Sequence, residues 1–195
     1  MADNAATTVE HLARRLTVVV PGSYDDVRTR YELLVPVVDY VAFAAAHSWD
    51  EALMAAEDSA PYGFMRYYRG DVSAVMRGSS APWNATQYLM GNHVIAERMF
   101  RHDPAVMLHA PLRTLIYTDS EGDTRFAVDQ PSTLFASYGI DAITVVGQYL
   151  DELLARLLAL LGAEVPALLQ PRAAPPRLGT LTARRAPAQA VRATM

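Results

Sequence analysis

Residues 85–119 read ATQYLMGNHVIAERMFRHDPAVMLHAPLRTLIYTD, and this stretch decides the fold. An apolar run ends at the pair Gly91-Asn92, and apolar residues at helical spacing begin after His93. Asparagine is a favoured N-cap because its side chain accepts a hydrogen bond from a backbone N–H of the first helical turn. A second apolar run, Leu112–Tyr117, follows a proline. The predicted order is therefore strand, turn, helix, loop and strand.

The rest of the chain continues this alternation of strands and helices. β-Branched or alternating apolar residues predict strands, and apolar residues three or four apart predict helices. The strands are expected at residues 14–20, 62–69, 86–90, 112–118 and 124–128. The helices are expected at residues 23–41 with a break at Pro36, 48–57, 71–77, 93–101, 131–138 and 141–161, the last one capped by Asp141.

These elements predict a single α/β domain at residues 11–165, after a leader at residues 1–10. We expect a mixed sheet of about five strands with helices packed on one side and a long C-terminal helix. That last helix has more apolar surface than one small sheet face needs. We therefore expect a homodimer or a heteromeric protein partner to cover the remainder.

Composition excludes several classes of chemistry. The chain of 195 residues contains no cysteine, which excludes disulfides, thiolate-bound zinc and a thiol nucleophile. All 17 basic residues are arginine, so lysine Schiff-base chemistry is excluded. The net charge of −4 gives no reason to expect nucleic acid. No signal peptide or membrane span is expected, and we predict a cytoplasmic protein with a disordered tail rich in proline, alanine and arginine at residues 166–195.

Three segments together resemble a known protein family. They are TQYLMGNH at residues 86–93, HDPAVMLHAPLRTLIYTD at residues 102–119 and GDTRFAVDQPSTL at residues 122–134. The resemblance is to the domain of unknown function 302 family and spans residues 63–162. It implies a small α/β protein that is often dimeric, and it implies no particular activity.

Two positions differ from the pattern of that family. Its members typically have proline after the Gly-Asn pair, where this chain has His93, and aspartate before the Pro-Leu-Arg segment, where it has His109. The N-terminus of a helix is its positive end and disfavours an imidazolium ion, so we expect His93 to be neutral near pH 7. A neutral imidazole can act as a base, a donor or a metal ligand. The alternative is that His93 replaces proline at a solvated turn.

Two neighbours of His93 bear on its chemistry. Glu97 lies four residues later, on the same helix face, where it would orient the imidazole or supply half of a metal site. Turns at strand ends form ligand crevices, so His93 and His109 would face one cleft if the strands beside them are neighbours. The alternative for His109 is a loop histidine bonded to backbone. We expect neither a bound metal nor a cofactor.

Four more residues complete the expected ligand site: Asn92, Tyr88, Arg113 and Asp71. Arg113 matches the arginine of the family pattern and would bind an anionic group, or else pair with Asp71 or Asp119. Asn92 adjoins His93, and Tyr88 would line an apolar pocket unless it is a core aromatic residue.

Three hypotheses on function remain open from the sequence. In the first, the chain is a cofactor-independent lyase, cyclase or isomerase of the kind found in bacterial secondary metabolism. His93 would be the general base and His109 the acid in the conversion of a small polar, anionic metabolite. In the second it is a ligand-binding or sensor domain without catalysis. In the third it is an architectural subunit of a heteromeric complex.

Overall fold

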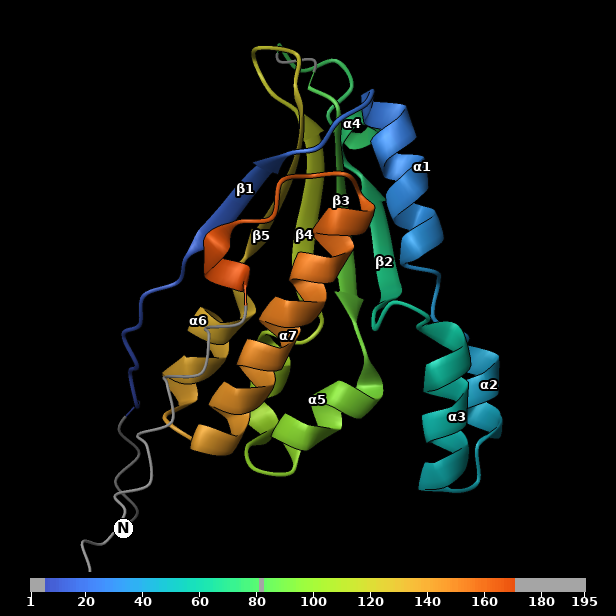
Figure 1. The fold of residues 1–195 in the computed structure, drawn as a ribbon, viewed down its shortest axis with the longest axis vertical. Helices are drawn as coiled ribbons and strands as arrows, with labels where there is room; N and C mark the ends of the chain where they lie inside the picture. Colours follow the sequence, from blue (N-terminus) through green and yellow to red (C-terminus); the bar gives the residue numbers. More distant parts are fainter. Residues whose placement is uncertain (1–5, 81–82, 171–195) are drawn as a thin grey trace, which may run out of the picture.

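The computed structural model describes residues 6–80 and 83–170, which form one α/β domain (Figure 1). Its single sheet has five strands in the order β1-β5-β4-β3-β2. The strands are β1 (Arg15–Val19), β2 (Met65–Asp71), β3 (Ala85–Gly91), β4 (Leu112–Thr118) and β5 (Thr124–Asp129). The α-helices are α1 (Tyr24–Leu34), α2 (Tyr40–Ala45), α3 (Trp49–Ser59), α4 (Val72–Val75), α5 (His93–Phe100), α6 (Pro131–Phe135) and α7 (Asp141–Leu160). Short 3-10 helices are η1 (Pro104–Leu108), η2 (Ala136–Tyr138) and η3 (Ala167–Leu169).

The sheet is antiparallel rather than mixed as predicted. Each of the four neighbouring strand pairs is antiparallel, and the parallel pairing among the described residues is an isolated bridge between Val37 and Arg66. The reason lies in the connection that holds α5 and η1. This connection returns the chain at the end of the sheet where β3 stops, whereas a parallel neighbour would need a crossover along the whole sheet.

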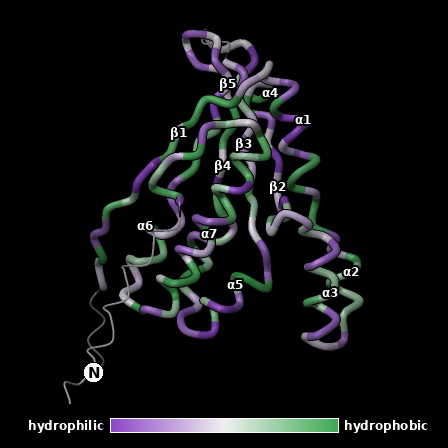
Figure 2. Tube along the Cα trace, in the orientation of Figure 1, coloured by the Kyte–Doolittle hydropathy of each residue, from purple (hydrophilic) through white to green (hydrophobic). Residues whose placement is uncertain are grey.

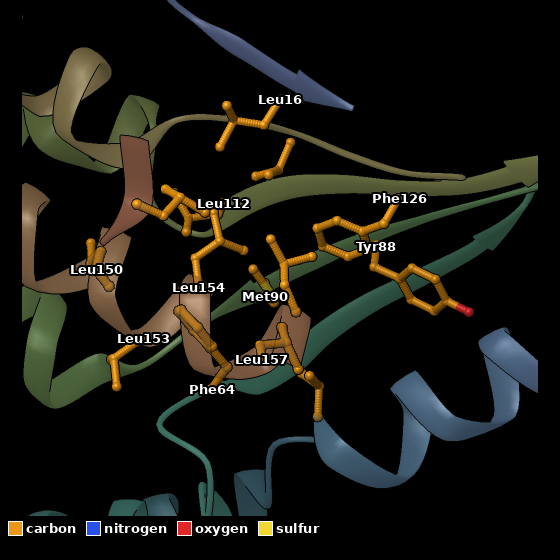
Figure 3. Packing of buried hydrophobic residues seen from close by; sticks show 14 of the residues in the cluster. Leu16, Phe64, Tyr88, Met90, Leu112, Phe126, Leu150, Leu153, Leu154 and Leu157 are labelled. Atoms are coloured by element: carbon orange, nitrogen blue, oxygen red, sulfur yellow. The ribbon is translucent and has the colours of Figure 1, made fainter. Parts of the chain in front are cut away.

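One face of the sheet is covered by helices, as predicted. Along β3, the alternate residues Thr86, Tyr88 and Met90 are fully buried. The ring of Tyr31 in α1 lies 4.7 Å from that of Tyr88, and leucines of α7 such as Leu154 belong to the same core (Figure 3). Each fully buried side chain of this size contributes about 1.5–3 kcal/mol. The two helices therefore share one face and fix which residues of β3 point inward.

The opposite face of the sheet carries no helix in the described part of the chain. Its central residues are Leu89, Leu115 and Ala127, which are half-buried, and Leu115 pairs directly with Ala127. Arg113 and Val19 on the same face are exposed. We call this partly apolar surface, which no described helix covers, the open face.

The long helix α7 uses its apolar residues within this chain. The buried leucines of α7 are Leu150, Leu153, Leu154, Leu157 and Leu158. The sequence predicted that part of the apolar surface of α7 would stay uncovered. In the structure most of this surface packs against the sheet, α5 and α6. Of its large hydrophobic residues, Val145 and Leu160 are exposed. The predicted partner remains a prediction, but α7 offers it little surface.

Of the two N-caps predicted from the sequence, Asn92 is confirmed and Asp141 is not. Ser23, Ser48 and Asn92 each accept a backbone N–H of the first turn. The predicted cap Asp141 is instead the first helical residue, and Ile140 occupies the N-cap without a side-chain hydrogen bond. Asp141 still places a negative charge at the positive end of the helix, which is favourable.

The core continues past the domain boundary predicted at residue 165. Leu169 is 1% exposed and belongs to the main core, and the Leu168 carbonyl accepts a hydrogen bond from the Gln130 amide. The predicted tail otherwise falls at residues 171–195, outside the described residues, as do residues 1–5 of the predicted leader. Within residues 6–80 and 83–170, we find no helix long and apolar enough to cross a membrane.

A buried carboxylate joins α7 to the end of β5. Asp151 is 7% exposed and accepts hydrogen bonds from the Ser132 backbone N–H at 3.0 Å and the Ser132 hydroxyl at 2.6 Å. It also accepts one from the Gln130 amide at 2.5 Å. Ser132 lies in the first turn of α6, and the N-cap residue of this helix makes no side-chain hydrogen bond. Asp151 therefore accepts a backbone N–H that would otherwise have no partner at the start of α6.

We predict that Asp151→Ala destabilises the fold by about 2–4 kcal/mol, because buried donors lose their acceptor. Urea unfolding followed by circular dichroism measures this. The matched control is Asp141→Ala on the same helix, which removes an exposed first-turn carboxylate and should cost less than about 1 kcal/mol. Equal effects of the two variants would contradict the anchoring role of Asp151.

Candidate functional site

The turn between β3 and α5 is held by Asn92, as predicted from its position. The Asn92 side-chain oxygen accepts hydrogen bonds from the Val94 N–H at 2.9 Å and the Ile95 N–H at 3.4 Å. Its amide nitrogen donates to the Gly63 carbonyl at 3.2 Å. Both ends of the side chain are thus engaged, so Asn92 positions the site rather than contacting a ligand freely.

Gly91 lets β3 approach the start of β4 closely. A Cβ at Gly91 would lie 3.4 Å from the side chain of Pro111. A cavity of about 20 Å³ lies beside this contact and is lined by Asn92, Ile95 and Leu112 among others. A space of this size holds roughly one water molecule. A metabolite therefore needs additional space in this region.

His93 forms a hydrogen-bonded pair with a tyrosine of β2. Its Nδ1 lies 2.8 Å from the hydroxyl of Tyr67. The imidazole ring also lies 4.8 Å from the ring of Phe43 in α2 and 5.0 Å from that of Tyr67. His93 is therefore placed where α2, β2 and the start of α5 meet, with one side exposed to solvent.

The surroundings of this pair keep both groups uncharged. Burial lowers the pKa of His93 below its ordinary value of 6.5, in the direction expected at a helix N-terminus. Burial, and then the nearby phenol of Tyr40, raise the pKa of Tyr67 above its ordinary value. A neutral Tyr67 hydroxyl can donate to an unprotonated Nδ1, which leaves the imidazole proton on Nε2, or accept from a protonated Nδ1, which leaves Nε2 free.

The partner of His93 is not the residue expected from helical spacing. Glu97 is on the same helix but forms an ion pair with Arg101, whose Nε lies 3.0 Å from Glu97 Oε1. Tyr67, which the sequence analysis did not single out, takes the role of orienting the imidazole. No local signal identifies Tyr67, because it lies at an irregularity where the β2–β3 register shifts between Arg66 and Tyr68.

His109 lies in a different set of contacts. It follows η1, and its ring lies 6.0 Å from both His11 and Tyr138 and 6.3 Å from Phe135. Burial, and then the neighbouring His11, lower the pKa of His109. None of the ring contacts in the described part of the chain is shared by His93 and His109. The cleft between the two histidines therefore stays a prediction from the sequence.

Tyr88 lies in the core, where its side chain is fully buried. Its hydroxyl donates to Glu32 at 2.8 Å, and Glu32 also forms ion pairs with Arg66 at 3.0 Å and Arg69 at 2.9 Å. Burial alone would raise the pKa of Glu32, but the hydrogen bonds from Tyr88 and Arg69 and the charge of Arg66 lower it. These contacts attach α1 to β2 and β3.

Arg113 was expected to bind an anionic group or else to pair with Asp71 or Asp119, and it forms an ion pair with neither carboxylate in the described residues. Arg113 is exposed on the open face, in register with Leu89. Asp71 ends β2 and caps α4 by accepting the Ala74 N–H at 3.0 Å. The alternative partner of Arg113, Asp119, forms its ion pair with Arg125 instead.

One group of carboxylates in the described residues has the spacing of a metal site. It consists of Asp119, Glu121 and Asp123 in the loop between β4 and β5. Asp119 already accepts the backbone N–H groups of Glu121 at 3.0 Å and Asp123 at 2.9 Å. Through these hydrogen bonds and its ion pair with Arg125, the Asp119 carboxylate holds the loop between β4 and β5 in place.

The fold and this site define a class: a small α/β domain with a five-stranded antiparallel sheet, helices on one face and a histidine at the strand–helix turn. The sequence profile of the family described as "Domain of unknown function DUF302" matches residues 42–161, more than half of the chain. The chain belongs to this family.

Structural comparison agrees with this membership. The crystal structure of an uncharacterized conserved DUF302 protein from Bacillus stearothermophilus superposes with a TM-score of 0.56 at 17% sequence identity. The match covers 75% of this chain and 97% of that one. At this identity the likeness establishes the fold alone. No curated protein matches the chain by sequence.

We predict that His93→Pro keeps its stability within about 1 kcal/mol of the parent, because His93 is the first helical residue and proline is favoured there. Asn92 already has the extended backbone, with φ −151° and ψ 123°, that a following proline requires. Urea unfolding measures the effect.

Val94→Pro is the matched control one position later. It removes the N–H that Asn92 accepts at 2.9 Å, so it should destabilise the protein clearly more than His93→Pro. If His93→Pro unfolds the protein while Val94→Pro does not, the assignment of His93 to the first helical position is wrong.

Proposed function

We propose that this chain binds a small polar metabolite and that His93 and Tyr67 act on it as a cofactor-independent acid/base pair. The observation that carries the proposal is the 2.8 Å contact between His93 Nδ1 and the Tyr67 hydroxyl. A general base or acid needs a pKa close to the working pH and an orienting partner. His93 has a pKa below 6.5 and is held by Tyr67.

The pair can move a proton without creating a lasting charge on tyrosine. A tyrosine hydroxyl is both donor and acceptor, so the neutral imidazole can place its proton on Nδ1, donate it to the Tyr67 oxygen and leave Nε2 free to accept a proton from a substrate. The imidazolium that forms returns a proton from Nε2 to the product, and Tyr67 stays neutral throughout. Elimination, cyclisation and isomerisation are reactions that need such a group and no redox cofactor.

Access to His93 is supplied by the hairpin of α2 and α3. This hairpin lies beyond the beginning of β2 (Figure 1), and of its described residues only Ala56 in α3 is buried. It rests on a small second core that contains Val38, Ala60 and Met65, with Phe43 beside His93. Segments with few buried contacts open at low cost in free energy. Opening of this hairpin would provide room beside His93, which does not line the 20 Å³ cavity.

The open face of the sheet supports a second proposal, on assembly. We propose that two copies of the chain pair through Leu89, Leu115 and Ala127, because face-to-face packing of two sheets buries partly apolar faces. A two-fold axis would place identical residues opposite each other. The sequence analysis placed the dimer interface on the last helix, and this proposal places it on the open face of the sheet instead.

Assembly is tested by light scattering coupled to size exclusion. We expect a mass of twice the 21.4 kDa chain, and we expect Leu115→Asp to reduce it to one chain by placing a charge in the interface. Val145→Asp on α7, which is 56% exposed, is the control and should leave the dimer intact. If Val145→Asp dissociates the dimer and Leu115→Asp does not, the interface lies on α7. A monomeric parent protein contradicts both positions.

Acid/base function has a direct signature in the titration of His93. We predict that its pKa, measured by NMR, lies below 6.5 and rises in Tyr67→Phe, because the lost hydrogen bond had stabilised the neutral imidazole. A depressed pKa contributes stability that is present above pH 6.5 and is lost as the pH falls through the folded-state pKa. A pKa at or above 6.5 in the parent protein contradicts the proposal.

Turnover is tested with a panel of small polar metabolites followed by NMR. Any conversion should fall by at least about 10²-fold in His93→Ala. His47→Ala, which removes an exposed histidine of the α2–α3 loop, should leave the rate unchanged. Binding without conversion by the parent protein would instead favour the ligand-binding alternative. If the parent protein neither binds nor converts any metabolite and is insoluble when expressed alone, an architectural subunit would be favoured.

A further inference from the structure

A larger cavity lies at the end of the sheet opposite His93. It measures about 450 Å³ and lies between the start of α1, α4 and the loop that joins β4 to β5. This is the upper end of the molecule in Figure 1, and Figure 2 shows the hydrophilic character of the β4–β5 loop there. Apart from one glycine, every lining residue has a polar side chain; six of them are Ser23, Arg28, Asp71, Asn84, Thr118 and Thr124. Its volume is within the range of small-molecule sites.

Several hydroxyl groups fix the wall of this cavity. Ser73 in α4 accepts the Ala85 N–H at 2.7 Å and donates to the Ala85 carbonyl at 3.3 Å. Thr124 donates to the Gly22 carbonyl at 3.0 Å. These bonds connect α4 to β3 and β5 to the start of α1. The wall is therefore organised before any ligand arrives, which lowers the entropy cost of binding.

Other polar groups of the wall remain available. The side chains of Asn84 and Thr118 make no hydrogen bond within the described part of the chain, although each can donate and accept. Asp71 uses one carboxylate oxygen to cap α4 through Ala74. In the described residues, its second oxygen has no hydrogen-bond donor.

The charges of the cavity select against anions. Arg28 is held by Asp25 through a 2.9 Å ion pair, and its guanidinium lies 5.9 Å from the centre of the Tyr24 ring. Asp71 has no ion-pair partner among the described residues and leaves an excess negative charge. An anionic ligand would meet two carboxylates, Asp25 and Asp71, and one arginine that is ion-paired but whose buried Nε has no hydrogen-bond partner in the described residues.

We infer that this cavity binds a neutral polyhydroxylated molecule of the size of a monosaccharide or cyclitol. Adjacent hydroxyl groups present donors and acceptors at short spacing, which matches the amide of Asn84, the hydroxyl of Thr118 and the free carboxylate oxygen of Asp71. The excess negative charge of Asp71 is met by ligand hydroxyl groups, which donate hydrogen bonds to its carboxylate. This site is independent of the acid/base pair at His93.

Saturation-transfer NMR and calorimetry with myo-inositol and D-glucose test this inference, with inorganic phosphate as the anionic comparison. We expect millimolar binding of at least one of the two polyols and none of phosphate. Asn84→Ala and Thr118→Val should each weaken polyol binding by about tenfold, the effect of one lost hydrogen bond. Neither residue is in the core, so both variants should keep the parent circular dichroism spectrum.

Two control variants separate this site from others. Glu121→Ala changes an exposed residue of the same loop that does not line the cavity, and it should bind as the parent does. His93→Ala should also retain full polyol binding, so failure of the acid/base proposal leaves this test unaffected. Phosphate binding stronger than polyol binding would overturn the inference. So would an absence of polyol binding, or equal binding by the parent, Asn84→Ala and Thr118→Val.

Discussion

Packing of α7 against one face of the antiparallel sheet is the contact on which the rest of the structure depends. Leu154 and Leu157 share a core with Met90 and Phe126, and all four are at most 1% exposed (Figure 3). Side chains alternate along a strand, so a shift of β3 by one residue would turn Tyr88 and Met90 away from that core. The register of β3 is thereby fixed, and with it the point at which the strand stops and α5 begins.

That point is where the sequence was most informative. Asn92 at the end of an apolar run predicts a helix start because capping is local chemistry, decided by residues within one turn. The same local chemistry caps α1 through Ser23 and α3 through Ser48. The predicted N-cap role of Asp141 is wrong. An aspartate is favourable both at the N-cap and at the first helical position, and the sequence does not distinguish these two positions. The antiparallel sheet was also missed, since strand direction depends on the path of the connections through space.

The site was predicted less completely than the fold for a related reason. His93 could be singled out from its place in the helix, but its partner comes from β2, 26 residues earlier. Tyr67 lies at the register shift between two strands, and no local pattern distinguishes it from Tyr68. Glu97 appeared suitable because it lies four residues after His93, yet Arg101 lies four residues after Glu97 and carries the opposite charge. Helical spacing alone does not decide between two such partners.

The two ends of β2 therefore support different chemistry within one strand. At its beginning, Tyr67 and the apolar ring of Phe43 desolvate His93 and keep it neutral. At its end, Asp71 leaves a carboxylate oxygen facing a cavity with polar walls. Partial burial lowers the pKa of an imidazole and favours its neutral form, whereas an unpaired carboxylate is stable only where water or hydroxyl groups reach it. Tyr67, which holds His93, and Asp71 lie near opposite ends of β2, and ion pairs from Arg66 and Arg69 to Glu32 attach this strand to α1.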